Sequence, residues 1–170
     1  MRCGLAELVK AAFVGDAGLL DMLEAQASGL ANGGSPSDDA IRRAVAVKWG
    51  IVARDPLESG ERHVLNFGHT AGHAIEAASG YRVVHGAAVA VGMRIEARIA
   101  SRVAGLQRHD LRRLSGLLDG LGLPQDPGCR FADAAPFLVR DKKVRDGRLR
   151  FALPSGPGRM HPGDGDWTIA

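Results

Sequence analysis

Apolar residues recur three or four positions apart along most of the chain, the spacing that gathers them on one face of a helix. The first such run is Leu5, Leu8, Val9, Ala12 and Phe13. Gly15 ends this pattern, and Asp16 is placed to cap a second helix that follows at once. The pattern therefore predicts two consecutive helices in about the first 30 residues.

The rest of the chain continues the helical pattern after a loop, residues 28–39, that is rich in Ser, Gly and Pro. Ser37 or Asp38 can cap a long helix that ends near Asp55, because the residue before a proline avoids the α conformation. Further helices are expected over residues 68–78, 85–103, 109–121 and 133–139. The pattern predicts a mainly α domain, with at most a short strand or hairpin near residues 148–154, which alternate.

Composition narrows the class of protein. The 170 residues are 45% hydrophobic, 24% charged and 5% aromatic, as expected for one globular domain rich in helices. The net charge is +3, but the basic residues are dispersed and do not alternate with aromatic ones, which argues against a nucleic-acid partner and fits a small anionic substrate. No apolar run approaches the roughly 20 residues of a membrane span. The two cysteines, Cys3 and Cys129, lie far apart in the sequence and belong to no cysteine motif. We therefore expect two free thiols in the reducing cytoplasm.

Three of the six histidines fall between Leu65 and Met93. His69 and His73 are four residues apart on one predicted helix, a spacing that can bind a metal, although no glutamate follows the first of them as in zinc proteases. Glycines at 68, 72, 86 and 92 accompany these histidines. Each glycine costs about 1 kcal/mol in a helix interior, so either a ligand approaches the backbone here or the helices pack unusually closely.

Four segments, in the right order, resemble one known family. Residues 65–93, LNFGHTAGHAIEAASGYRVVHGAAVAVGM, resemble the signature of the 3-dehydroquinate synthases and the related sugar phosphate cyclases. The family's other motifs are matched by RCGLAELVK near the start, by AVKWGIVARDPLESGERHVLNFGHT before the signature, and by RDKKVRDGRLRFALPSGPG near the end. The resemblance implies the helical C-terminal domain of that fold.

The resemblance implies a divalent metal, Zn or Co, bound by Glu7, His69 and His85. Two imidazoles and one carboxylate leave open coordination positions, as a catalytic metal site requires. Lys10 follows Glu7 by three residues, so both side chains can face one cleft from the first helix. The family further implies Lys10, His73 and Glu58 as catalytic groups, with His73 near the substrate phosphate.

The resemblance also implies an anion-binding substrate site. Lys48 and Arg62 would bind the substrate carboxylate, for which the guanidinium fork is well shaped. Asn66 would lie near the phosphate, and Lys142 or Lys143 would reach it. These groups imply a small phosphorylated sugar acid as the partner of the protein.

The activity implied is that of a phosphate-eliminating carbon–oxygen lyase of the shikimate pathway. It converts 3-deoxy-arabino-heptulosonate 7-phosphate to 3-dehydroquinate, with NAD as a cofactor. Nothing in the chain resembles the Gly-rich turn of the family's N-terminal nucleotide-binding domain, and the NAD-binding residues stay unassigned. We therefore expect residues 1–170 to form a single metal- and substrate-binding domain of a cytoplasmic enzyme that is a homodimer at full length.

One departure keeps other functions open. Most family members have HGEAV where this chain has HGAAV, with Ala87 in place of glutamate. A related cyclase of secondary metabolism, an aminodehydroquinate synthase or a sedoheptulose 7-phosphate cyclase, is one alternative. Lys48 and Arg62 favour a substrate that carries a carboxylate over sedoheptulose 7-phosphate. A catalytically inactive, truncated metal-binding domain is the other alternative.

Overall fold

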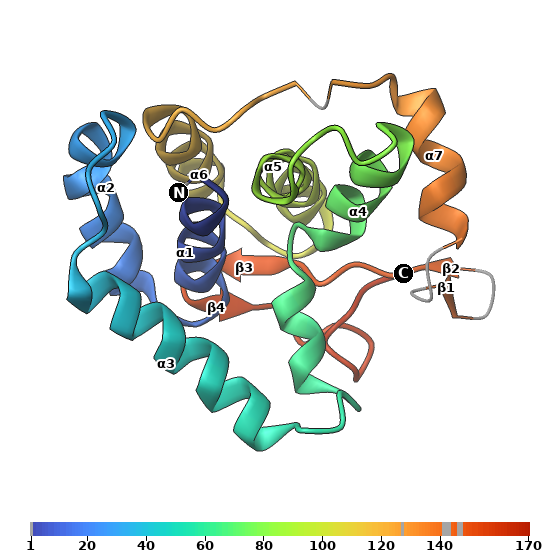
Figure 1. Ribbon diagram of the computed structural model, residues 1–170. Coiled ribbons are helices and arrows are strands. Elements are labelled where there is room, and N and C mark those ends of the chain that lie inside the picture. The colour runs from blue at the N-terminus through green and yellow to red at the C-terminus, as the bar shows by residue number, and fades with distance from the viewer. Residues whose placement is uncertain (1, 127, 141–143, 146–147) are drawn as a thin grey trace.

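The computed structural model describes residues 2–126, 128–140, 144–145 and 148–170 and is built mainly from helices (Figure 1). The long helices are α1 (Arg2–Gly15), α2 (Ala17–Ala31), α3 (Asp38–Arg54), α4 (His69–Ala78), α5 (His85–Val103), α6 (Arg108–Gly120) and α7 (Phe131–Arg140). A 3₁₀ helix, η1 (Glu61–Asn66), leads into α4. The predicted mainly α fold class is confirmed.

Helix α1 lies at the centre, with α2 and α3 on one side and α5 on the other (Figure 1). Helix α4 packs between α5 and α7. The core is apolar and includes Phe13 of α1 and Phe67, both fully buried, whose ring centroids are 6.2 Å apart. This arrangement brings the N-terminal half of α1 beside the first turns of α4 and α5.

The helix ends follow the predicted caps closely. Asp16 accepts a hydrogen bond from the backbone N of Leu19 at 3.0 Å, and Ser37, not Asp38, caps α3. Helix α3 ends at Arg54, before the Asp55–Pro56 step, as expected. The loop predicted over residues 28–39 was too long at both ends, because α3 already begins at Asp38 and α2 continues for an extra turn to Ala31. Burial of the Leu30 side chain in the core stabilises that extra turn despite its poor helix formers.

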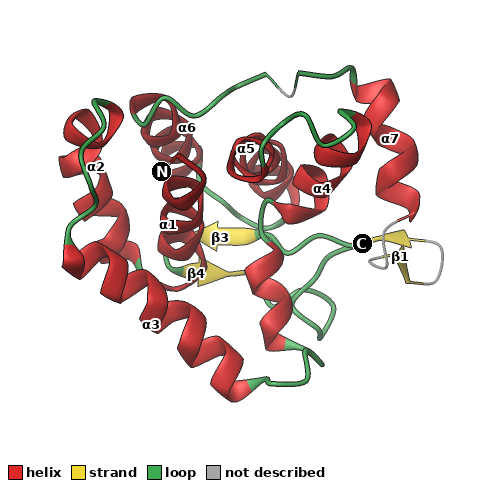
Figure 2. Ribbon diagram, viewed as in Figure 1, coloured by secondary structure: helices red, strands yellow, loops and turns green. Residues whose placement is uncertain are grey.

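The strands form two small antiparallel hairpins (Figure 2). One pairs β1 (Val144–Arg145) with β2 (Arg148–Leu149), and the other pairs β3 (Pro154–Gly156) with β4 (Arg159–Met160). The alternating segment 148–154 is therefore divided between two hairpins and is not one strand. The second hairpin was not predicted from the sequence. It packs against α1, and Met160 of β4 is buried there.

The glycines of the histidine motif let helices α4 and α5 pack closely. A Cβ atom added at Gly92 would lie 2.0 Å from the carbonyl oxygen of Gly68, and one at Gly72 would lie 3.3 Å from the backbone of Ala88. Gly86 touches α1 in the same way, since its added Cβ would lie 2.2 Å from Cα of Cys3. Close helix packing, the second of the two alternatives, explains these glycines.

We expect Gly92→Ala to destabilise the protein by about 3 kcal/mol, the upper end of the range for overpacked cores. The added methyl group meets a backbone oxygen, which cannot rotate away as a side chain can. Urea unfolding measures the effect. Gly116→Ala on α6 is the matched control, because nothing lies within 4 Å of its added Cβ. The control should gain up to about 1 kcal/mol from helix propensity, and a similar gain at Gly92 would contradict the packing account.

Candidate metal and substrate site

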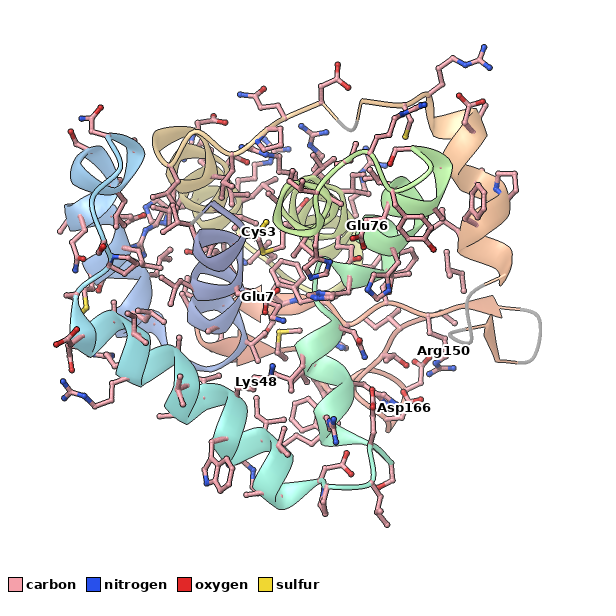
Figure 3. All side chains as sticks on the ribbon, in the orientation of Figure 1. Cys3, Glu7, Lys48, Glu76, Arg150 and Asp166 are labelled. Carbon is pink, nitrogen blue, oxygen red and sulfur yellow. The ribbon has the colours of Figure 1, made fainter. Side chains whose placement is uncertain are left out.

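Three helices contribute one side chain each to a compact group of possible metal ligands. Glu7 comes from α1, His69 is the first residue of α4, and His85 is the first residue of α5 (Figure 3). His69 Nε2 lies 3.5 Å from Glu7 Oε1, and His85 Nε2 lies 3.9 Å from the same oxygen. One donor atom from each residue lies within 4.8 Å of those of the other two. The structure thus brings together the three residues that the sequence predicted as ligands.

The distances between these ligand atoms fit a cation with tetrahedral coordination, such as Zn²⁺. Two ligand atoms that each lie about 2.0–2.2 Å from zinc are separated by roughly 3.3–3.6 Å, close to the two distances from Glu7 Oε1. That oxygen is buried and has no hydrogen-bond partner among the described residues. A buried carboxylate oxygen without a partner is costly, and a cation between the three side chains would satisfy it.

The electrostatics keep Glu7 and His69 in the protonation states that bind a metal. Burial, with the nearby charge of Lys10, lowers the pKa of His69 to about 4, so the imidazole is neutral at pH 7. Burial acts to raise the pKa of Glu7, but the charge and hydrogen bond of Lys10 outweigh it and hold that pKa below its usual value. The His69 ring lies with Nδ1 3.1 Å from the backbone oxygen of Phe67. Because a carbonyl only accepts, Nδ1 carries the hydrogen and Nε2 presents its lone pair.

Lys10 and Lys48 place positive charge beside the candidate metal ligands. Lys10 Nζ lies 2.7 Å from Glu7 Oε2, and its side chain is 9% exposed. Lys48 of α3 lines a cavity of about 260 Å³ together with both of these residues (Figure 3). Ile41 and Val45, exposed on the same helix, line it too. The cavity therefore combines two ammonium groups with an apolar wall, which suits an anionic organic molecule.

His73 lies one helical turn after His69 and is exposed to solvent. Its ring centroid is 5.4 Å from that of His69 and 6.2 Å from that of His85. The three imidazoles therefore form one cluster, in which His73 and His85 are exposed and His69 is not.

Three further predicted site residues, Glu58, Arg62 and Asn66, lie on the segment between α3 and α4. Arg62 Nε is 3.9 Å from Glu58 Oε2, and an Arg62 Nη1 donates to the backbone oxygen of Pro56 at 3.0 Å. Asn66 is the last residue of η1. The structure thus pairs two of these side chains with each other. Lys142 and Lys143 lie outside the described residues.

Asp55 organises this segment, a role the sequence analysis missed. The buried carboxylate accepts hydrogen bonds from the backbone N of Ser59, Gly60 and Arg62, at 2.9, 2.8 and 3.0 Å, and from the Ser59 hydroxyl. Glu58, inside the loop, has a φ of +56°, a strained conformation for a residue with a side chain. The Asp55 carboxylate holds the loop in this shape and fixes the start of η1.

We expect Asp55 to make the free energy of unfolding fall at acidic pH. Its hydrogen bonds from backbone N–H groups, above all that of Arg62, hold the pKa of Asp55 far below its usual value. A lowered pKa in the folded state adds stability above the unfolded value of about 3.9, and this stability is lost as the pH falls below it. In urea unfolding from pH 6 to pH 2.5, the advantage of the wild type over Asp55→Asn should therefore shrink. A constant difference between the two proteins would contradict this.

Glu96 of α5 is a second carboxylate that the sequence did not reveal. It is fully buried, and its two oxygens accept hydrogen bonds from the backbone N of Gly68 at 2.7 Å and of Ala71 at 3.0 Å. Gly68, the N-cap of α4, has no side chain with which to cap that helix. Glu96 therefore replaces the missing cap and joins the first turn of α4, which carries His69, to α5.

Comparison with known proteins identifies the family of this chain. The family described as "3-dehydroquinate synthase C-terminal" matches residues 4–144. The chain belongs to this family. It is 40% identical over 166 residues to a 3-dehydroquinate synthase of Paracoccus denitrificans, covering 93% of this chain and 45% of the relative. With that of Mycolicibacterium gilvum the identity is 42% over 169 residues, covering 95% of this chain and 46% of the relative. The chain therefore spans about half the length of these curated relatives.

Solved structures of the wider sugar phosphate cyclase group share the fold. ValA, a 2-epi-5-epi-valiolone synthase from Streptomyces hygroscopicus with NAD⁺ and Zn²⁺ bound, matches with a TM-score of 0.79 and 28% identity, covering 94% of this chain and 45% of that one. A 2-deoxy-scyllo-inosose synthase complexed with carbaglucose-6-phosphate, NAD⁺ and Co²⁺ matches with a TM-score of 0.83 and 28% identity, covering 99% and 48%. Within the described residues, no helix has the length and apolar character needed to cross a bilayer.

Proposed function

We propose that this chain is the metal- and substrate-binding domain of a 3-dehydroquinate synthase. The observation that carries the proposal is the group of Glu7, His69 and His85, whose donor atoms surround a carboxylate oxygen that has no hydrogen-bond partner among the described residues. The identity of about 40% to several 3-dehydroquinate synthases supports it. The reaction proposed is the conversion of 3-deoxy-arabino-heptulosonate 7-phosphate to 3-dehydroquinate with loss of phosphate.

Each side chain of the site has a defined task in this proposal. A zinc or cobalt ion held by Glu7, His69 and His85 would polarise the substrate hydroxyls and lower their pKa. Lys10 keeps Glu7 ionised through their 2.7 Å ion pair and presents an ammonium to the same cavity. His73, an exposed imidazole of the cluster, would lie near the substrate phosphate.

The cations and the amide would orient the substrate. Lys48 and Arg62 would bind its carboxylate, Glu58 its hydroxyls, and Asn66 with Lys142 or Lys143 its phosphate. NAD would be held mainly by the N-terminal nucleotide-binding domain that the family resemblance implies. In the proposal the whole enzyme is cytoplasmic and dimeric, and its other partners are small molecules only.

A related cyclase is the second candidate, because the structural neighbours act in that wider group and Ala87 departs from the HGEAV pattern. The test is turnover by a polypeptide that combines this chain with a nucleotide-binding domain, given NAD⁺ and zinc. Release of phosphate together with 3-dehydroquinate from the heptulosonate is expected. Turnover of sedoheptulose 7-phosphate but not of the heptulosonate would favour the second candidate. If neither substrate is turned over in a metal-dependent reaction, both candidate functions are contradicted.

We expect Arg62→Lys to slow turnover of the heptulosonate at low substrate by about ten- to a hundred-fold, since one hydrogen bond to a charged group is worth roughly 1.5–3 kcal/mol. Lysine keeps the charge but loses the fork that binds a carboxylate through two hydrogen bonds. kcat/KM for substrates with and without the carboxylate measures the effect. Arg54→Lys is the control, because Arg54 makes a similar two-bond contact with Glu61 outside the predicted substrate residues. Equal losses for both substrates would show that Arg62 does not bind the carboxylate.

A further inference from the structure

His85 differs from His69 in what supports its ring. The His69 side chain is 13% exposed and bonded to the backbone, whereas that of His85 is 43% exposed. His85 opens helix α5, after an N-cap residue that makes no side-chain cap. Burial alone therefore does not hold this imidazole toward Glu7, and its orientation needs another contact.

Glu76 provides that contact from α4. His85 Nδ1 lies 3.2 Å from Glu76 Oε1 and 3.3 Å from Oε2, and the Glu76 side chain is only 14% exposed. Figure 3 labels Glu76 on α4. The contact crosses the turn that joins α4 to α5. Glu76 lies on α4, the helix that also carries His69, so this contact fixes the His85 ring relative to His69.

The contact also fixes which nitrogen of His85 is free to bind a cation. A neutral imidazole has one nitrogen that donates and one that accepts, and a carboxylate only accepts. Nδ1 therefore carries the hydrogen and donates it to Glu76. The lone pair is left on Nε2, the atom that lies 3.9 Å from Glu7 Oε1.

Glu76 has a second conceivable role as a metal ligand, because His73, Glu76 and His85 also form a group with donor atoms within 4.8 Å of one another. Both Glu76 oxygens, however, lie within 3.3 Å of His85 Nδ1. A cation bound there through Nδ1 would replace this hydrogen bond. It would also require His85 to bind through the nitrogen that faces away from Glu7.

We propose that Glu76 is a positioning residue, which holds His85 in the tautomer and orientation that bind the metal. The proposal rests on the metal site of the proposed function. A carboxylate that accepts the second N–H of a ligating histidine makes the ring a stronger and better-aimed ligand, and loss of such a partner typically weakens metal binding by about 10–100-fold.

The test compares Glu76→Met with Glu76→Gln. Competition with a zinc chelator should show zinc bound about 10–100-fold more weakly by the Met variant and a smaller loss in the Gln variant, whose amide oxygen still accepts from Nδ1. In the metal-free protein, ¹⁵N NMR of the imidazoles should show hydrogen on Nδ1 of His85 in the wild type. In the Met variant it should show a mixture of tautomers. Glu24→Met is the matched control, because Glu24 pairs with Arg113 away from the site.

Three results would overturn the proposal. The first is wild-type zinc affinity in the Met variant. The second is an unchanged His85 tautomer in that variant. The third is a fall from two bound zinc ions to one, which would make Glu76 a ligand. A wild type that binds no zinc would contradict the metal site of the proposed function, while the NMR measurement would still test Glu76 separately.

Discussion

Glu7→Gln is expected to weaken zinc binding by more than about 100-fold, beyond the range seen when only a partner of a ligand is lost. The amide keeps the size of the side chain but removes the negative charge that both imidazole Nε2 atoms face. A neutral amide oxygen is also a poor zinc ligand beside histidine. The effect should therefore exceed that of any change at Glu76.

Stability in the presence of zinc gives a second measurement of the same effect. At a free zinc concentration of 100 times the wild-type Kd, the free energy of unfolding of the wild type should rise by about 2.7 kcal/mol. Glu7→Gln should gain almost nothing at that concentration, while Glu24→Gln, on α2, should gain as much as the wild type. A full gain in the Glu7 variant would show that the ion binds elsewhere, for example between His73 and Glu76.

The spacing of residues along the sequence predicted one pair of neighbouring histidines but not the group of possible metal ligands. Spacing of four residues singles out His69 and His73, and the two rings do lie at a centroid distance of 5.4 Å. The group that includes the buried, unpartnered oxygen Glu7 Oε1, however, joins His69 to His85. Its members come from three helices, so local periodicity could not find it. Only the resemblance to a family implied it, through the paired motifs.

Local signals predicted helix ends well wherever the cap is local. Asp16 and Ser37 bond to backbone groups three residues away, so their role can be read from adjacent residues. The extra turn of α2 depends instead on burial of Leu30 by the rest of the fold. The second hairpin, β3 with β4, depends on packing against α1. Such tertiary contacts leave no periodic signal in the sequence.

The supporting carboxylates were missed for the same reason. Glu76, Glu96 and Asp55 occur in helices or turns where a charged residue is normally solvated. Each instead accepts hydrogen bonds from groups that the sequence does not mark: an imidazole across a turn, the start of another helix, or the backbone of a loop. Their functions follow from the placement of helices around α1 and α5, and so required the structure.

Glu96→Ala is expected to destabilise the protein by roughly 2–6 kcal/mol, because two buried backbone donors lose their acceptor. The backbone N–H groups of Gly68 and Ala71 lose the carboxylate that accepts their hydrogen bonds inside the core, and each orphaned donor costs about 1–3 kcal/mol. Urea unfolding of the metal-free protein measures this. Glu24→Ala, with a more exposed side chain, should cost under about 1 kcal/mol, as an ion pair near the surface does.

Glu96→Gln keeps the size of the side chain, so it tests the loss of the hydrogen bonds that cap α4 separately from the loss of side-chain volume. The amide oxygen can still accept from one backbone N–H, but the amide NH₂ would face the other, so about half of the loss should remain. In a variant that stays folded, the first turn of α4 is held less firmly, and zinc binding through His69 should weaken with it. A Glu96→Ala protein with both wild-type stability and wild-type zinc affinity would show that Gly68 needs no cap from α5.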